Sequence, residues 1–202
     1  MPLMLITAPV GEPITLAEAK LQVQQFSAVD DGLLSAIMIP AARDRCEDAT
    51  QRALLTQTYD LYLDGFPSGS SIVLPKPPLR SVTSVQYYDT GGTLQTLTLS
   101  TDYLVQAPAG ARCQRGRIAL PQSGTWPATI SQIGAVIIRF VCGYGAAVDV
   151  PPALKAAMLL DIGRLYANRE DVITGTIMAS LPDGVHATYW RYRSHPTQRR
   201  AA

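Results

Sequence analysis

The stretch Gln57-Thr58-Tyr59-Asp60-Leu61-Tyr62-Leu63 decides the fold class, because the pattern of the apolar residues changes there. Aromatic and other β-favouring residues are frequent in this run. Gly65 and Pro67 follow it and stop it, which is typical of the end of a β-strand. Before this point the apolar residues recur at helical spacing, and after it they alternate in short runs. The sequence therefore predicts helices first and strands next.

Six more short runs downstream have the composition of strands. They cover residues 71–74, 82–88, 93–99, 103–106, 117–120 and 135–142. Turn residues lie between them: Pro75-Lys76-Pro77-Pro78 predicts a stiff corner, and Asp89-Thr90-Gly91-Gly92 predicts a hairpin. Seven short strands at this spacing favour a small antiparallel sandwich or barrel.

A short helix is predicted over residues 15–25, on the N-terminal side of the strands. Thr15-Leu16-Ala17-Glu18 has the spacing of a capping box, in which the Thr15 hydroxyl and the Glu18 carboxylate each accept a backbone amide of the other residue. Pro13 blocks an earlier start. The apolar residues of this segment then fall on one face of the helix.

A longer helix is predicted over residues 31–52, with Asp30 and Asp31 as candidate N-caps. Pro40 lies inside this helix, where proline removes one backbone hydrogen bond and clashes with the carbonyl four residues earlier. We therefore expect a kink near Ile37 rather than two separate helices.

The helical pattern returns after the strands. Val150-Pro151-Pro152 opens a helix with an apolar stripe on one side, since proline is tolerated in the first turn. We expect this helix to end near Asp171. Residues 172–180 are expected to form a loop, and Pro182-Asp183-Gly184 precedes a short helix or arm over 185–193.

These elements predict an α+β fold: a small helical bundle with an antiparallel β module inserted between its second and third long helices. Segments 1–56 and 146–183 are assigned to the helical body. The β insertion covers 57–145, and a C-terminal arm covers 184–202.

The composition is unusual in its low charge. Of 202 residues 47% are apolar, yet only 16% are charged, against about 25% in average domains. The net charge of +1 excludes a polycation and an acidic disordered tail. Two interpretations of the low charge remain: a free surface rich in uncharged polar residues, or a surface covered by other subunits. No apolar run reaches the roughly 18 residues that span a bilayer, and the start lacks the features of a signal peptide, so a cytoplasmic protein is expected.

Residues that could carry chemistry are sparse. Cys46, Cys113 and Cys142 are far apart and form no metal-binding spacing, so each is expected to be a small buried side chain. His186 and His195 both lie near the C-terminus and are poor candidates for catalysis, which needs a base held rigidly beside its nucleophile. We therefore expect no enzymatic activity, no cofactor and no metal.

The C-terminal arm has the most informative local composition. It carries no acidic residue after Asp183, but seven aromatic or arginine residues: Tyr189, Trp190, Arg191, Tyr192, Arg193, Arg199 and Arg200. Three interpretations compete. The arm is a solvated tail, a segment that docks on a protein through the residue types that anchor interfaces, or a segment that stacks on nucleic acid.

A different function class is also open. Trp126 and the Tyr87-Tyr88 pair are candidate stacking residues of a β-sandwich module, flanked by helices, that binds carbohydrate or protein. The alternative for these aromatic side chains is ordinary packing in the core or a loop.

The order of segments resembles the head–tail connector family of tailed bacteriophages and prophages, also called adaptor or head-completion proteins. The resemblance covers nearly the whole chain in one order. It rests on Glu12-Pro13-Ile14-Thr15-Leu16-Ala17-Glu18-Ala19-Lys20, Thr50-Gln51-Arg52-Ala53-Leu54-Leu55-Thr56-Gln57-Thr58, Leu74-Pro75-Lys76-Pro77-Pro78-Leu79, Arg139-Phe140-Val141-Cys142-Gly143-Tyr144-Gly145, Val150-Pro151-Pro152-Ala153-Leu154-Lys155-Ala156-Ala157-Met158, Tyr166-Ala167-Asn168-Arg169-Glu170 and Leu181-Pro182-Asp183-Gly184-Val185. Pro40 departs from the family pattern.

The resemblance implies a structural protein of the virion neck, made in the cytoplasm of the bacterial host. Such proteins form a ring, usually of twelve subunits, that joins the portal protein to a stopper or tail-completion protein and extends the DNA channel. DNA passes without sequence-specific binding, and no membrane is involved. The family's C-termini dock on the portal, which makes the seven residues of the arm the expected portal contact. We expect this arm to be disordered alone and to order against the portal.

Overall fold

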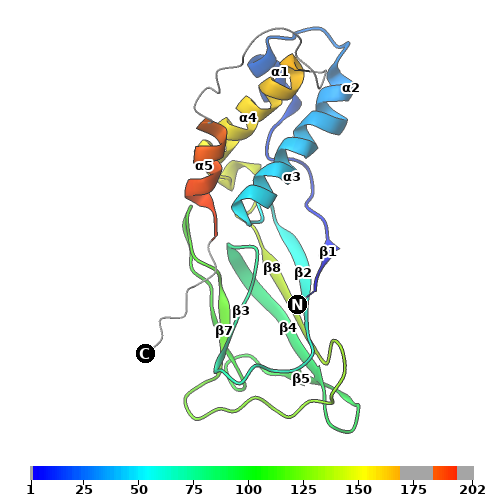
Figure 1. Ribbon diagram of the computed structural model, residues 1–202, viewed down its shortest axis with the longest axis vertical. Coiled ribbons are helices and arrows are strands. Elements are labelled where there is room, and N and C mark those ends of the chain that lie inside the picture. The colour runs from blue at the N-terminus through cyan, green and yellow to red at the C-terminus, as the bar shows by residue number, and fades with distance from the viewer. Residues whose placement is uncertain (1, 169–183, 195–202) are drawn as a thin grey trace, which may run out of the picture.

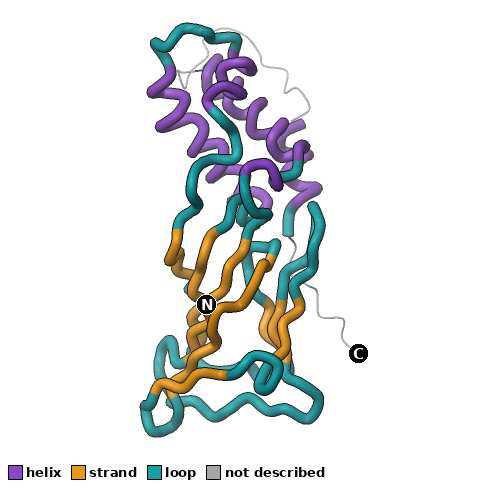
Figure 2. The backbone as a smooth tube through the Cα atoms, turned by 180° about the vertical axis from the view of Figure 1, so that it is seen from behind, coloured by secondary structure: helices purple, strands orange, loops and turns teal. Residues whose placement is uncertain are grey.

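The computed structural model describes residues 2–168 and 184–194, and it confirms the α+β class. The chain forms an elongated molecule, with the helices gathered at one end and the strands at the other (Figure 1). Figure 2 shows the same division from behind. The strands between residues 57 and 142 lie between α3 (Ile39–Thr50) and α4 (Pro152–Ala167) in the sequence, as predicted.

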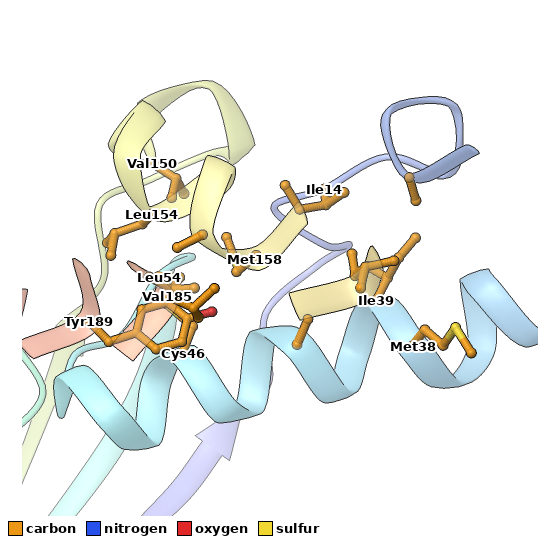
Figure 3. Close-up of a cluster of buried hydrophobic side chains, with 14 of the residues drawn as sticks. Ile14, Met38, Ile39, Cys46, Leu54, Val150, Leu154, Met158, Val185 and Tyr189 are labelled. Atoms are coloured by element: carbon orange, nitrogen blue, oxygen red, sulfur yellow. The ribbon is translucent and has the colours of Figure 1, made fainter. Parts of the chain in front are cut away.

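The helical body is built around α4, which contacts α1 (Leu16–Val23), α3 and α5 (Gly184–Tyr192). One apolar core joins these helices (Figure 3). Its fully buried members include Leu34, Cys46, Leu54, Leu154, Met158 and Ile162. A short 3-10 helix, Ala147–Asp149, precedes α4.

The predicted capping box at the start of α1 is confirmed. The Thr15 Oγ1 accepts the Glu18 amide at 3.2 Å, and the Glu18 carboxylate accepts the Thr15 amide at 2.7 Å. The backbone hydrogen bond from Thr15 is the main cause that lowers the pKa of Glu18. The Glu18 carboxylate also accepts the Lys155 Nζ at 3.0 Å, which ties α1 to α4.

The long second helix is irregular at the expected place. It begins as α2 (Asp31–Leu33), continues as a π-helix over Leu34–Met38, and becomes α3 at Ile39. The Ile39 amide donates to the Leu34 carbonyl, five residues back, so the turn before Pro40 is widened. A wider turn relieves the crowding that the proline ring causes in an α-helix, and π-turns of this kind are a known cause of helix irregularity.

The predicted side-chain cap at the start of this helix is wrong. Asp30 precedes α2, but its side chain makes no capping hydrogen bond. Its Oδ2 instead accepts the Tyr166 hydroxyl at 2.6 Å, and Asp31 pairs with Lys20 at 2.6 Å. Both aspartates therefore hold neighbouring helices together.

All seven predicted strands are present, and they form two antiparallel sheets. The larger sheet has the order β1 (Leu3–Thr7), β2 (Gln57–Leu63), β8 (Val136–Cys142), β4 (Leu79–Tyr88) and β5 (Leu94–Leu97). The smaller sheet has the order β3 (Ser71–Val73), β7 (Arg117–Ala119) and β6 (Leu104–Gln106). Strand β1, at the edge of the larger sheet, was not predicted.

A second apolar core lies in the β module and includes side chains from both sheets, as in a sandwich. Its fully buried members include Leu74, Val85, Ile118, Ile138 and Phe140. The predicted hairpin is confirmed between β4 and β5, where the Asp89 carboxylate accepts the amides of Gly91 and Thr93, each at 2.9 Å.

Buried polar contacts join the two parts of the molecule. The Glu47 carboxylate on α3 accepts the Leu54 amide and the Gln57 Nε2, both at 2.7 Å. Gln57 is the first residue of β2, so Glu47 fixes the direction in which the chain leaves the helical body. Close packing at Gly143, whose Cα faces the Leu55 carbonyl, fixes the path by which the chain returns from the β module to the helical body.

Candidate docking surface

The first part of the C-terminal arm is an ordered helix, which agrees with the short helix considered over 185–193 but not with the expectation that the arm is disordered alone. Residues 184–192 form α5, which packs on α3 and α4. Val185 and Tyr189 belong to the helical core with exposed fractions of 3% and 2%. Figure 3 shows the Tyr189 ring beside Val185 and Cys46. Tyr189 is thus covered within the chain, and burial raises the pKa of its hydroxyl.

Other side chains at the C-terminal end of α5 are exposed. Trp190 has an exposed fraction of 54%, and Arg191 and Arg193 are exposed beside it. The Arg193 guanidinium lies over the Trp190 ring, 5.2 Å from its centroid, which is a cation–π contact. We call Trp190 and Arg191 of α5, together with Arg193 just after it, the exposed α5 face. It combines the aromatic and guanidinium groups that anchor protein interfaces.

The end of α5 is held at the junction with the β module. Arg52 is almost fully buried, and its Nε donates to the Tyr192 carbonyl. Its Nη2 donates to the Cys113 carbonyl at 2.8 Å. The Ser194 amide donates to the Thr50 carbonyl at 2.8 Å. Tyr192 is half-buried, so it contributes to packing as well as to the surface.

The remaining predicted residues of the arm, Arg199 and Arg200, lie outside the described residues, as do His195 and the loop expected over 172–180. Of the seven predicted docking residues, the structure therefore places three on one exposed face, buries Tyr189 and half-buries Tyr192.

The aromatic residues of the alternative binding module are packed against the protein itself. Trp126 stacks on Phe66 with a centroid distance of 4.8 Å and an interplanar angle of 2°. Its Nε1 donates to the Gly69 carbonyl at 2.8 Å, and Phe66 meets the edge of Tyr87 at 5.7 Å. Packing accounts for these side chains, and Tyr88 is also half-buried.

Within residues 2–168 and 184–194, no three histidine, cysteine or acidic side chains lie together as a metal site. Cys46, Cys113 and Cys142 are free and buried, as expected, and burial raises the pKa of the Cys142 thiol to about 12. No helix in the described part of the chain is long and apolar enough to cross a membrane.

Strand β1 is a candidate contact surface that the sequence analysis missed. Met4, Leu5 and Ile6 have exposed fractions of 56%, 47% and 41%, and no charged residue interrupts the strand. Edge strands usually carry charges or proline to prevent pairing with other chains. The signal in the sequence is the uninterrupted apolar run from Leu3 to Ile6.

Neither a protein-family model nor a curated protein matches the chain at a significant level. Solved structures do match it. A chain from the neck of an empty gene transfer agent (GTA) particle, computed with C6 symmetry, has a TM-score of 0.77 and 26% identity, covering 97% of both chains. A chain from the virion of a native GTA particle has a TM-score of 0.77 and 25% identity, with the same coverage.

A third match is a chain from the neck of a native GTA particle computed with C12 symmetry. It has a TM-score of 0.75 and 26% identity, and 97% of each chain is covered. The similarity thus extends over the helices and the β module together. This agreement across the whole fold confirms the predicted resemblance to the head–tail connector proteins of tailed phages and phage-like particles.

Proposed function

We propose that the chain is a structural neck protein of a tailed phage or phage-like particle. It is one subunit of a ring that joins the portal protein to the stopper or tail-completion protein and extends the DNA channel. The observation that carries this proposal is the match over 97% of both chains to a chain from a GTA neck. The C12 symmetry of a second matching neck supports a ring of twelve subunits.

The physical properties of the chain are compatible with this role. A ring subunit meets two neighbours and two further layers, so much of its surface is covered. Few charges reduce the cost of burying unpaired ions in these contacts, and 16% charged residues is low. DNA must slide through the ring, and a net charge of +1 gives little general attraction to phosphates. In this role the chain is not an enzyme and needs no cofactor.

We assign parts of the ring to parts of the chain. Segments 1–56 and 146–183 form the helical body of the ring, and 57–145 forms a β module beside it. The arm 184–202 supplies the portal contact. Because α5 is already folded, the contact begins with the exposed α5 face rather than with the whole arm, and Arg199 and Arg200 extend it.

Electron microscopy of the chain bound to the portal protein of its own particle tests the ring. The expected result is one additional layer with the rotational symmetry of the ring. Portal particles without such a layer, at saturating concentrations of the chain, would overturn the proposal. The free chain gives no such test, because ring assembly can require the portal.

The portal contact is tested by substitutions on the exposed α5 face. Trp190→Ala and Arg193→Ala are expected to weaken portal binding at least about tenfold, because aromatic and arginine anchors dominate interface energies. Arg112→Ala is the matched control, since Arg112 is exposed in the β module. Equal affinities of all three variants and the wild type, measured by interferometry with immobilised portal, would contradict the assignment. Removal of residues 184–202 is a poor test, because it takes Val185 and Tyr189 out of the core.

The edge strand β1 is our candidate for one flank of the subunit. Its exposed apolar side chains suit a surface that a neighbouring copy covers. Ile6→Lys is expected to prevent the ring from closing while the free chain keeps its thermal stability. Gln122→Lys adds the same charge on an exposed loop and is expected to change neither. Normal rings with Ile6→Lys would show that β1 is not a subunit contact.

A further inference from the structure

The last described residue of the arm is fixed to both parts of the molecule. Ser194 is 6% exposed. Its amide donates to the Thr50 carbonyl at the end of α3, at 2.8 Å. Its hydroxyl accepts the Arg115 Nε at 3.1 Å, and its carbonyl lies 3.4 Å from the Arg115 Nη2. Thr50 belongs to the helical body, whereas Arg115 belongs to the β module.

A second arginine, Arg52, contacts the chain at Tyr192, two residues before Ser194. Arg52 donates to the Tyr192 carbonyl and, through its Nη2, to the Cys113 carbonyl at 2.8 Å. Cys113 lies two residues before Arg115, so Arg52 holds both the end of α5 and the segment that carries Arg115. We call Arg52 and Arg115 the arginine clamp.

Arg52 satisfies a group that α5 itself leaves open, the Tyr192 carbonyl, whereas Arg115 holds Ser194 two residues beyond the end of the helix. The last carbonyls of an α-helix lack partners within the helix and carry partial negative charge. The Arg52 side chain supplies a partner and a positive charge to such a carbonyl, and hydrogen bonds from charged donors are stronger than neutral ones. The clamp therefore fixes where α5 ends and the direction in which the chain leaves it.

The exposed α5 face lies directly beside these contacts. Trp190, Arg191 and Arg193 precede Ser194 by one to four residues, and the end of α5 lies next to the β module (Figure 1). An interface anchor that is held in one position loses less conformational entropy when it binds. A loose helix end would have to be ordered at the moment of docking.

We propose that Arg115 is a positioning residue for portal docking: it holds the exposed α5 face in its binding position through Ser194 without touching the portal. The proposal rests on the proposed function of that face. It makes the β module a contributor to portal affinity although the contact itself is made by α5.

The first test needs no portal and uses hydrogen exchange in the full chain. With Arg115→Ala, the Ser194 amide is expected to exchange at least about tenfold faster, because its neighbouring hydroxyl and carbonyl lose their partner. Amides in β2 and α4 are expected to keep their rates. Arg117→Ala is the matched control, since Arg117 lies two residues away and donates to Gln106 at 2.6 Å instead. Equal Ser194 exchange in both variants would overturn the clamp.

The second test measures portal affinity. Arg115→Ala is expected to weaken binding about fivefold or more, Arg115→Lys less, and Arg117→Ala not at all. Ser194→Ala removes the hydroxyl acceptor, so Arg115→Ala is expected to cost less in that background than in the wild type. Additive effects of the two substitutions would overturn the link between Arg115 and Ser194.

Different results would refute the docking face and the positioning role of Arg115. If Trp190→Ala leaves portal affinity unchanged, the proposed docking face is wrong, whatever Arg115→Ala does. If Trp190→Ala weakens binding and Arg115→Ala does not, the docking face stands and the positioning role of Arg115 is refuted.

Discussion

Two adjacent residues of α5 are expected to respond to alanine substitution in opposite ways. Tyr189 is 2% exposed and packs in the helical core, whereas Trp190 is 54% exposed. Truncation of a buried aromatic side chain costs about 3–5 kcal/mol, because transfer energy is lost and a cavity remains. Tyr189→Ala should therefore destabilise the chain by this amount, while Trp190→Ala should change its stability by less than about 0.5 kcal/mol.

The contribution of the Tyr189 hydroxyl can be separated from that of its ring. The hydroxyl donates to the Asp161 Oδ2 over a long distance of 3.4 Å, while Asp161 also accepts the Arg45 Nη1 at 3.1 Å. Tyr189→Phe is thus expected to cost less than about 1 kcal/mol. Nearly all of the effect of Tyr189→Ala should come from the ring.

Urea unfolding followed by circular dichroism measures these differences. In a chain of 202 residues, the loss expected for Tyr189→Ala corresponds to a fall in Tm of roughly 10 °C. A Tyr189→Ala variant within 1 kcal/mol of the wild type would refute the burial of this residue, and so would an equal loss with Trp190→Ala. In the first case residues 184–192 would behave as a free arm, one of the two possibilities that the sequence left open.

Two further predictions concern the junction between the helical body and the β module. Burial is the largest cause that raises the pKa of the Glu47 carboxyl in the folded chain above its ordinary value of 4.5. The contribution of Glu47 to the free energy of unfolding is therefore fully present below pH 4.5 and is lost as the pH rises through the pKa of the folded chain. Glu47→Gln should therefore gain stability relative to the wild type as the pH rises above 4.5 in urea unfolding, and a relative loss would show that its partners outweigh burial. Gly143 has a φ of +112°, and a Cβ there would lie 2.0 Å from the Leu55 carbonyl oxygen, so Gly143→Ala should cost at least about 2 kcal/mol. Gly92→Ala is its control, because Gly92 has a φ of +82° with open space around it; a similar small loss in both variants would contradict the close packing at Gly143.

The sequence by itself determined the local elements. The capping box needs only Thr15 and Glu18 three residues apart, and the structure forms it as predicted. Strand β2 coincides with the predicted run 57–63, since side-chain alternation and the following turn residues are local signals. The irregularity before Pro40 is local as well, because a proline ring acts on its own preceding turn.

Only the tertiary structure decided which face of an element is covered. Composition grouped Tyr189 with Trp190, but packing against α3 and α4 buries the first and exposes the second. The position of Asp30 predicts a helix cap, yet its carboxylate instead accepts a hydrogen bond from the hydroxyl of Tyr166, 136 residues away in sequence. Such contacts depend on how distant segments meet, which no local pattern encodes.

The same reason explains the arginine clamp and strand β1. Arg115 and Ser194 are 79 residues apart, and Leu5 in β1 lies opposite Tyr59 in β2. The chain order and the element types therefore follow from the sequence. The docking face, the residues that hold it and the open edge of the sheet follow from the long-range packing of helices and strands.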